Sequence, residues 1–222
     1  MSTPRNHAVD IDIEPPMLTK LTELVLASGN QGKRREFERL LSPLGVTVLD
    51  QASLGVTPAP EPHQTYVENA LAKARHASAL TGKPALADDS GLSVRALDGA
   101  PGVRSARFAT PVQGLTQDAA NNAKLIGALY GASTREAMYV AILVLVRQPD
   151  DPLPIIAQGF WSGEIVDQPR GEGGFGYDPH FWLPSLGQTA AELTPEVKNT
   201  LSHRAIATQA LIATMRQFSL IG

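Results

Sequence analysis

The chain has 222 residues, a formal net charge of −3 and no cysteine. This length suits one large domain or two joined lobes with a substantial core. The acidic balance argues against a general nucleic-acid-binding protein, which normally carries a basic surplus. Without cysteine, the chain forms no disulfide, thiolate metal site or thiol nucleophile.

The N-terminal residues 1–20 differ in composition from the rest of the chain. Three prolines lie there among polar and charged residues with little to bury, which predicts a disordered tail before one folded unit over residues 21–222. No signal peptide is visible, and the longest apolar run, residues 139–146, is too short to span a bilayer. We therefore expect a cytoplasmic protein that does not enter membranes.

The first elements predict a strand, a tight turn and a helix. Residues 24–27 form an apolar run that ends in Ser28-Gly29-Asn30, which is typical of a strand entering a turn. A helix follows and ends near Pro43 and Gly45. Its apolar positions recur at helical spacing and are Phe37, Leu40, Leu41 and Leu44.

A second helix is predicted over residues 66–80. A short strand over residues 85–87 follows it and delivers Asp88 and Asp89 at its end. Lys73 lies on a different stripe of the helix from the apolar positions. The side chains expected on the buried face of this helix are Val67, Ala70, Leu71, Ala74 and Ala77.

The second half of the chain predicts further strands and a closing helix. Residues 138–147 are rich in Val, Ile and Leu, which indicates a central buried strand. Residues 155–161 and 163–166 are expected to pair with each other across a turn over residues 161–164. The last helix is expected to start near Ser202.

Alternating strands and helices predict the α/β fold class, with some antiparallel pairing over residues 138–166. One more helix is expected over residues 121–130. No internal repeat or low-complexity block interrupts this pattern.

The turn over residues 28–33 is the first candidate site. Backbone N–H groups at a helix N-terminus bind anions, and Lys33 adds a positive charge there. The segment is not a P-loop, because Ala27 and Arg34 stand where that motif needs Gly and Ser or Thr. An ordinary Gly-Asn turn explains the segment equally well.

Asp88 and Asp89 are the second candidate site. Adjacent carboxylates repel each other unless a cation or hydrogen-bond donors compensate them, and magnesium is often held by one or two carboxylates plus phosphate oxygens. Glu61 could supply another ligand. The alternative is an Asp-rich turn before Gly91; the metal interpretation gains support from Lys73 and Lys33, which would need a polyanion between them.

Two more segments carry polar or glycine-rich sequence of possible functional use. In residues 171–179, glycines flank Phe175, which offers a stacking face; the alternative is a flexible hairpin loop. Ser202 is a good helix N-cap, which places His203 and Arg204 in the first turn, where cations are unfavourable. That placement indicates an anion or carbonyl partner, and an exposed His-Arg pair without a role is the alternative.

Taken together, these segments resemble the inosine triphosphate pyrophosphatase family. Six motifs follow the family order over about residues 24–215, nearly the whole chain outside the tail. They are Ser28-Gly29-Asn30-Gln31-Gly32-Lys33, Glu68-Asn69-Ala70 with Lys73-Ala74-Arg75, Ala87-Asp88-Asp89-Ser90-Gly91-Leu92, Gly99-Ala100-Pro101-Gly102-Val103 with Ser105-Ala106-Arg107, Gly174-Phe175-Gly176-Tyr177-Asp178-Pro179 and Ser202-His203-Arg204.

The resemblance implies two lobes around a long mixed sheet with flanking helices, a site in the cleft between the lobes, and a homodimer. It implies that Asp89 binds Mg²⁺ and helps to activate the attacking water, with Glu61 and Asp88 as further acidic partners and Lys73 at the reacting phosphates. Phe175 would stack on the purine. The remaining residues implied to contact a small-molecule nucleotide are Ser28, Asn30, Gln31, Gly32, Lys33, Ser90, Gly176, Tyr177, Asp178, Lys198, His203 and Arg204.

The resemblance also implies a reaction, which is hydrolysis of non-standard purine nucleoside triphosphates (ITP, dITP, XTP) to the monophosphate and pyrophosphate. Donors such as His203 and Arg204 suit a 6-keto oxygen and disfavour the 6-amino group of adenine. We expect Arg204→Ala to lose ITP turnover while folding normally. The alternatives are a related pyrophosphatase for other modified nucleotides and a non-catalytic nucleotide sensor.

Overall fold

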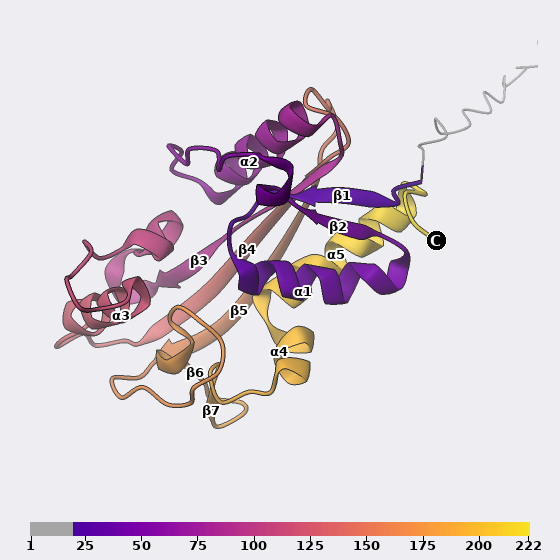
Figure 1. Cartoon of the computed structure of the whole chain (residues 1–222). Coiled ribbons are helices and arrows are strands. Elements are labelled where there is room, and N and C mark those ends of the chain that lie inside the picture. The colour runs from indigo at the N-terminus through magenta and orange to yellow at the C-terminus, as the bar shows by residue number, and fades with distance from the viewer. Residues whose placement is uncertain (1–19) are drawn as a thin grey trace, which may run out of the picture.

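A seven-stranded mixed sheet forms the centre of the molecule (Figure 1). The computed structural model describes residues 20–222, so the tail predicted over residues 1–20 lies, apart from Lys20, outside the described residues. In spatial order β2-β1-β3-β4-β5-β6-β7, the strands are β2 (Thr47–Asp50), β1 (Glu23–Leu26), β3 (Ala85–Val94), β4 (Glu136–Val146), β5 (Ile155–Ile165), β6 (Phe181–Leu183) and β7 (Gln188–Thr189).

Within residues 20–222, five α-helices flank this sheet, with short 3₁₀ turns between the elements. The α-helices are α1 (Gln31–Leu41), α2 (Tyr66–Thr81), α3 (Gln117–Ala128), α4 (Pro195–Leu201) and α5 (His203–Gln217). The 3₁₀ turns are η1 (Ser42–Leu44), η2 (Ala52–Leu54), η3 (Arg95–Leu97), η4 (Gly102–Arg107) and η5 (Asp178–His180). Among the described residues, none of these helices has the length and apolarity needed to cross a membrane.

The sheet confirms the predicted α/β class and its antiparallel part. Strand β1 pairs in parallel with β2 and β3, whereas β3, β4, β5, β6 and β7 pair antiparallel in succession. Helices α1 and α5 pack on one face through a cluster that contains Phe37 and Leu211, and α2 packs on the other face through its alanines. A third cluster around Leu125 joins α3 to the far ends of β3, β4 and β5.

Most of the predicted helices lie close to their expected bounds because their end signals are local, whereas the helix expected over residues 121–130 runs over Gln117–Ala128. Asn30 is the N-cap of α1, and its side chain accepts from the N–H groups of Gly32 and Lys33. Gly82 ends α2 in the left-handed conformation, and Ser202 caps α5 by accepting from the Ala205 N–H. One prediction for α2 was wrong: Val67 is exposed, and Tyr66 packs against the core cluster instead.

The prediction that Asp88 and Asp89 end a short strand was wrong. Strand β3 runs through both residues to Val94, paired with β4 at each of its ten positions. The polar run Asp88-Asp89-Ser90 interrupts the apolar pattern by which a strand is recognised. The antiparallel partner supplies the backbone hydrogen bonds that keep the strand regular through this run.

The turn predicted over residues 161–164 was also wrong. Strand β5 is continuous over eleven residues, and Glu164 pairs with Glu136 at its far end. The prediction of a turn rested on Gly163, but this glycine lies within the strand. Residue 163 is glycine because β6 packs closely against it: a Cβ there would lie 2.5 Å from the Trp182 carbonyl oxygen. The hairpin joins β4 and β5 instead, over residues 147–154.

Candidate active site

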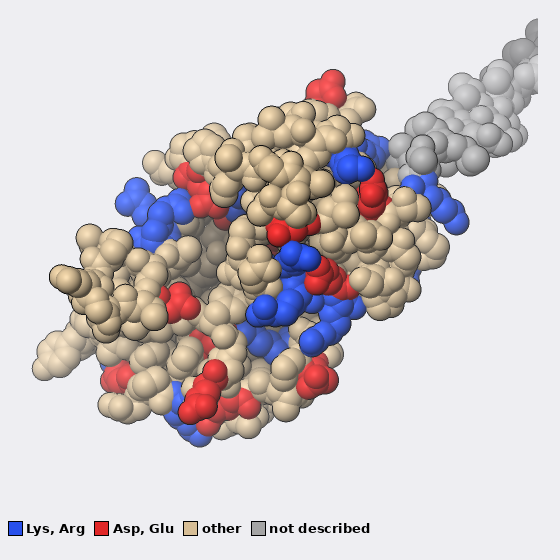
Figure 2. Space-filling model, in the orientation of Figure 1, with Lys and Arg blue, Asp and Glu red and all other residues tan. Residues whose placement is uncertain are grey.

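A cavity of about 650 Å³ lies where β1 ends and β3 continues. Strand β1 pairs with β3 only as far as Leu86, so beyond that point one edge of β3 is open to the cavity. The surface is hollowed between the part that carries α3 and the part that carries α1 and α2 (Figure 2). Of all the predicted site residues, only Gln31 and Gly32 do not line this cavity.

Asp88 and Asp89 point to opposite faces of the sheet, because successive side chains of a strand alternate. Asp88 meets Lys33 of α1 and Arg204 of α5, whereas Asp89 meets Lys73 of α2. Their adjacency in the sequence suggested that one cation compensates both carboxylates. In the structure, each carboxylate pairs with different cations.

The two lysines meet at the open edge of β3. The Nζ atoms of Lys33 and Lys73 donate to the backbone carbonyl oxygen of Asp88 at 3.4 and 3.0 Å, from opposite sides of the sheet. This carbonyl has no strand beside it once β1 has ended. Because β1 ends before this point, the Asp88 carbonyl oxygen is free to accept from both lysine ammonium groups.

Asp88 is the centre of a buried ion-pair network. Lys33 binds its Oδ1 at 2.9 Å, and Nε of Arg204 binds its Oδ2 at 2.5 Å. Arg204 also donates to Glu36 at 2.6 Å and to the Ser90 hydroxyl at 3.1 Å. Burial alone would raise the pKa of Asp88, but Arg204 and Lys33 hold this pKa far below its usual range.

Asp89 and Glu61 share one ammonium group. Nζ of Lys73 lies 2.8 Å from Oδ1 of Asp89 and 2.9 Å from Oε1 of Glu61. Burial would lower the pKa of Lys73, but the two carboxylates keep this pKa above its ordinary value. Two carboxylates and a cation are therefore already assembled at this end of the cavity.

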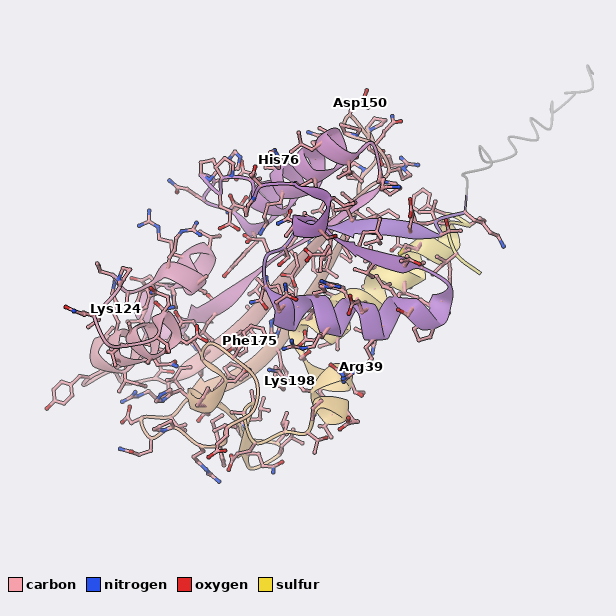
Figure 3. The ribbon with its side chains drawn as sticks, viewed as in Figure 1. Arg39, His76, Lys124, Asp150, Phe175 and Lys198 are labelled. Atoms are coloured by element: carbon pink, nitrogen blue, oxygen red, sulfur yellow. The ribbon has the colours of Figure 1, made fainter. Side chains whose placement is uncertain are left out.

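Asp178 organises another part of the cavity wall. Its carboxylate pairs with the Lys198 ammonium and accepts from the Tyr139 hydroxyl at 3.1 Å and from the Phe175 N–H at 2.8 Å. Residue 174 must be glycine, because a Cβ there would lie 2.0 Å from Oδ2 of Asp178. Asp178 thus fixes the loop that carries Phe175. The centroid of the Phe175 ring lies 5.3 Å from Nζ of Lys198, and both side chains are labelled in Figure 3.

His203 is buried in the cavity wall, which rejects the alternative of an exposed His-Arg pair. Its ring stacks on Tyr139 with centroids 4.7 Å apart, and its Nδ1 has no hydrogen-bond partner among the described residues. Burial, with Arg204 and Lys198 nearby, lowers the pKa of His203 well below its usual value. The ring is therefore neutral, with one N–H donor and one acceptor nitrogen.

The remaining predicted residues have mainly structural contacts. Tyr177 is buried and donates its hydroxyl to the Ser105 carbonyl at 2.8 Å, and the Gly176 N–H donates to Asp118 at 2.8 Å. At the start of α1, Asn30 satisfies two N–H groups that the anion-site prediction left free. Gly32 lies outside the cavity lining, but its Cα face contacts the Phe175 ring: a Cβ there would be 3.2 Å from Cε1.

Three residues of this site had no predicted role, although Arg107 stands in one of the six motifs. Glu36 pairs with Arg204, Tyr139 holds Asp178 and stacks on His203, and Arg107 binds Glu61 at 2.5 Å. Glu36 and Lys33 have the i, i+3 spacing that places two side chains on one side of a helix, a signal that could have indicated Glu36. Tyr139 carries a hydroxyl at the start of the apolar run of β4, a signal that could have indicated a polar partner nearby.

Proteins of similar sequence cover most of this chain. A dITP/XTP pyrophosphatase of Ralstonia nicotianae is 59% identical over 198 residues, which is 89% of this chain and 98% of the relative. One from Bordetella pertussis is 60% identical over 196 residues, which is 88% of this chain and 92% of the relative.

Solved structures extend the similarity to the fold. A HAM1 protein from Coxiella burnetii superposes with a TM-score of 0.82 at 45% identity, covering 89% of this chain and 100% of the other. The Staphylococcus aureus Ham1 protein superposes with a TM-score of 0.77 at 37% identity, covering 88% of this chain and 98% of the other. The sequence model described as the Ham1 family matches residues 24–214. The chain belongs to the Ham1 family.

Proposed function

We propose that this chain hydrolyses non-standard purine nucleoside triphosphates (ITP, dITP and XTP) to the monophosphate and pyrophosphate. The observation that carries the proposal is the convergence of Lys33 and Lys73 on the open edge of β3, next to Asp89. Relatives about 60% identical bear the name dITP/XTP pyrophosphatase, which supports the same substrates for this chain.

Magnesium fits the carboxylates at the Lys73 end of the cavity. Asp89 and Glu61 each place an oxygen within 2.9 Å of one ammonium nitrogen, so a single cation already bridges them. Magnesium often takes two carboxylates and completes its shell with water and phosphate oxygens. We propose Asp89 and Glu61 as ligands and leave Asp88 out, because Lys33 and Arg204 occupy both of its oxygens.

The side chains divide the work of the reaction. Bound magnesium would neutralise charge on phosphate oxygens and lower the pKa of a coordinated water. Lys33 and Lys73 offset the charge that develops on the departing pyrophosphate. Asp89, whose pKa is raised by burial despite the nearby Lys73, is placed to orient the attacking water and accept its proton at the carboxylate.

Base recognition is proposed for the Asp178 end of the cavity. Phe175 stacks on the purine, and the Lys198 ammonium and the neutral His203 ring offer donors to a 6-keto oxygen. Arg204 is held by Asp88 and Glu36, so it contributes mainly by fixing this wall and the neighbouring Ser90. Adenine, with a donor at position 6, would leave these donors unpaired.

We also propose a homodimer in the cytoplasm, formed from a single folded unit over residues 21–222. The sheet face that α2 covers over β4 continues onto β5, where Ile156 and Phe160 are 44% and 47% exposed. Large apolar side chains grouped on one sheet face favour burial against a second copy. Glu164 lies at the end of the same face.

The direct test incubates the purified protein with ITP or ATP, with and without magnesium, and resolves pyrophosphate from orthophosphate. We expect magnesium-dependent formation of IMP and pyrophosphate from ITP, with ATP nearly untouched. Turnover of modified pyrimidine nucleotides in place of ITP would favour the related pyrophosphatase. Tight ITP binding without turnover, even with magnesium, would favour a sensor.

A further inference from the structure

Arg107 has no role in the proposed reaction, yet its side chain lies in the same cavity. It ends the 3₁₀ turn η4, and both hydrogen bonds that its side chain makes in the described part of the chain go to Glu61. Nη1 lies 2.5 Å from Oε2 of the carboxylate, and Nη2 lies 3.3 Å from the backbone oxygen. Despite this pairing, the Arg107 side chain is 48% exposed.

The backbone just before Arg107 is fixed from three directions. Asn121 of α3 donates to the carbonyl oxygens of Ser105 and Ala106, at 3.2 and 3.3 Å. Tyr177 donates to the same Ser105 carbonyl, and the Leu92 N–H of β3 donates to the Ser105 hydroxyl at 2.8 Å. The backbone at Arg107 is therefore held in place, while its long, half-exposed side chain can change partner.

Glu61 would have to release one of its cations if it bound the magnesium proposed above. Lys73 occupies one carboxylate oxygen and Arg107 the other. Lys73 has further partners in Asp89 and in the Asp88 carbonyl, and its side chain is 12% exposed. Arg107 depends on Glu61 alone and is exposed, so it is the cation that would be released.

We propose that Arg107 is a further phosphate-binding residue, which exchanges Glu61 for the terminal phosphates of the nucleotide, the part that leaves as pyrophosphate. The inference rests on the proposed function. Arg107 binds Glu61, the carboxylate that shares the Lys73 ammonium with Asp89, and these are the groups that the proposed function places at the phosphates. A guanidinium group suits this exchange because its fork of donors fits carboxylate and phosphate oxygens alike.

The test measures binding of inorganic pyrophosphate by calorimetry at saturating magnesium, without any need for turnover. We expect Arg107→Ala to weaken this binding about tenfold, as expected for loss of a charge-assisted pair. The affinity of Arg107→Lys for pyrophosphate should lie between those of the wild-type protein and Arg107→Ala, because lysine keeps the charge but cannot donate two parallel hydrogen bonds. Binding of IMP, which lacks the terminal phosphates, should be the same in all three proteins.

Arg104→Ala is the matched control. Arg104 lies on the same 3₁₀ turn and is exposed, and the described residues show no ion pair for it. We expect this variant to bind pyrophosphate as the wild-type protein does.

Several results would overturn the proposal. If Arg107→Ala changed the affinity for magnesium alone but bound pyrophosphate normally at saturating magnesium, Arg107 would act only by holding Glu61. Equal weakening of IMP and pyrophosphate would indicate a general distortion of the cavity. Failure of the wild-type protein to bind pyrophosphate would exclude the site, whereas pyrophosphate binding without ITP hydrolysis would reject only the proposed function.

Discussion

Arg204 and Asp88 lie 116 positions apart in the sequence, yet Nε of Arg204 donates to Oδ2 of Asp88 at 2.5 Å. Their side chains are 3% and 0% exposed, so the pair is removed from water. Burial would lower the pKa of Arg204, but Asp88 and Glu36 raise this pKa above its usual value. The pair joins the N-terminus of α5 to the middle of β3.

Arg204→Ala is therefore expected to destabilise the protein, contrary to our sequence-based expectation of normal folding. Removing one partner of a buried ion pair costs about 3–5 kcal/mol, because the remaining charge stays buried. We expect the free energy of unfolding in urea to fall by this amount and ITP turnover to be lost. The control is Arg39→Ala, which changes an exposed residue of α1 (Figure 3). If Arg204→Ala were as stable as the wild-type protein, Asp88 would tolerate the loss of its arginine partner.

Phe175→Ala should weaken nucleotide binding without a large loss of stability. The ring is only partly buried, and stacking on a base contributes about 1–3 kcal/mol. We expect KM for ITP to rise about tenfold. Tyr130→Ala removes an aromatic side chain that is 94% exposed and should leave KM unchanged. An unaltered KM in Phe175→Ala would remove this ring from base recognition.

Gly159→Ala should displace the start of α5. An added Cβ would lie 2.0 Å from the His203 carbonyl oxygen and 2.6 Å from the Ala207 nitrogen, both backbone atoms that cannot turn aside. We expect the free energy of unfolding to fall by about 3 kcal/mol. In Gly127→Ala on α3, the new Cβ meets no atom within 4 Å, and this control should gain up to about 1 kcal/mol. Equal stability of the two variants would contradict the close helix–strand contact.

Asp151 should make stability depend on pH. A hydrogen bond from the Arg147 side chain is the main cause that lowers the pKa of Asp151 to about 2. Because this folded-state pKa lies below the unfolded value of about 3.9, the contribution is complete above about pH 5 and is lost as the pH falls through about 2.

We expect Asp151→Asn to cost about 2 kcal/mol of unfolding free energy at pH 7, with most of the difference lost by about pH 2. Urea unfolding across this pH range measures it. Asp150→Asn changes the exposed neighbour and serves as the control. A difference that stayed constant down to pH 2 would mean that the ionised carboxylate is not the cause.

Phe160→Glu should prevent the proposed dimer. A charge on the exposed face of β5 would have to be buried without a partner against the second copy. We expect sedimentation to give a dimer for the wild-type protein and a monomer for the variant, with Tyr130→Glu remaining dimeric. A wild-type monomer, or a dimeric Phe160→Glu protein, would move the interface away from β5 or remove it.

The sequence predicted helices better than strand ends, for physical reasons. Asn30, Gly82 and Ser202 act within a few residues of themselves, so helix limits can be read locally. The length of β3 depends on β4, a partner more than forty residues away, and on cations that compensate Asp88 and Asp89. No short pattern in the sequence contains that information.

Residues that line the candidate site were predictable where they lay in recognisable motifs, but their pairings were not. Phe175 and Asp178 stand together in the sequence, yet only the fold shows that Asp178 fixes the loop of Phe175. Glu36 and Tyr139 were missed because each stands in a regular amphipathic or apolar element. Their partners, Arg204 and Asp178, come from distant parts of the chain.

The alternation of Asp88 and Asp89 limits how the length of the chain can vary. Inserting or deleting one residue between Leu86 and Asp88 would exchange the faces of both carboxylates, so each would meet the cations of the other. Length variation among related chains should therefore avoid β3 and collect in exposed connections such as residues 110–115. An alignment of homologues should show β3 as a segment where residues are substituted and their number never changes.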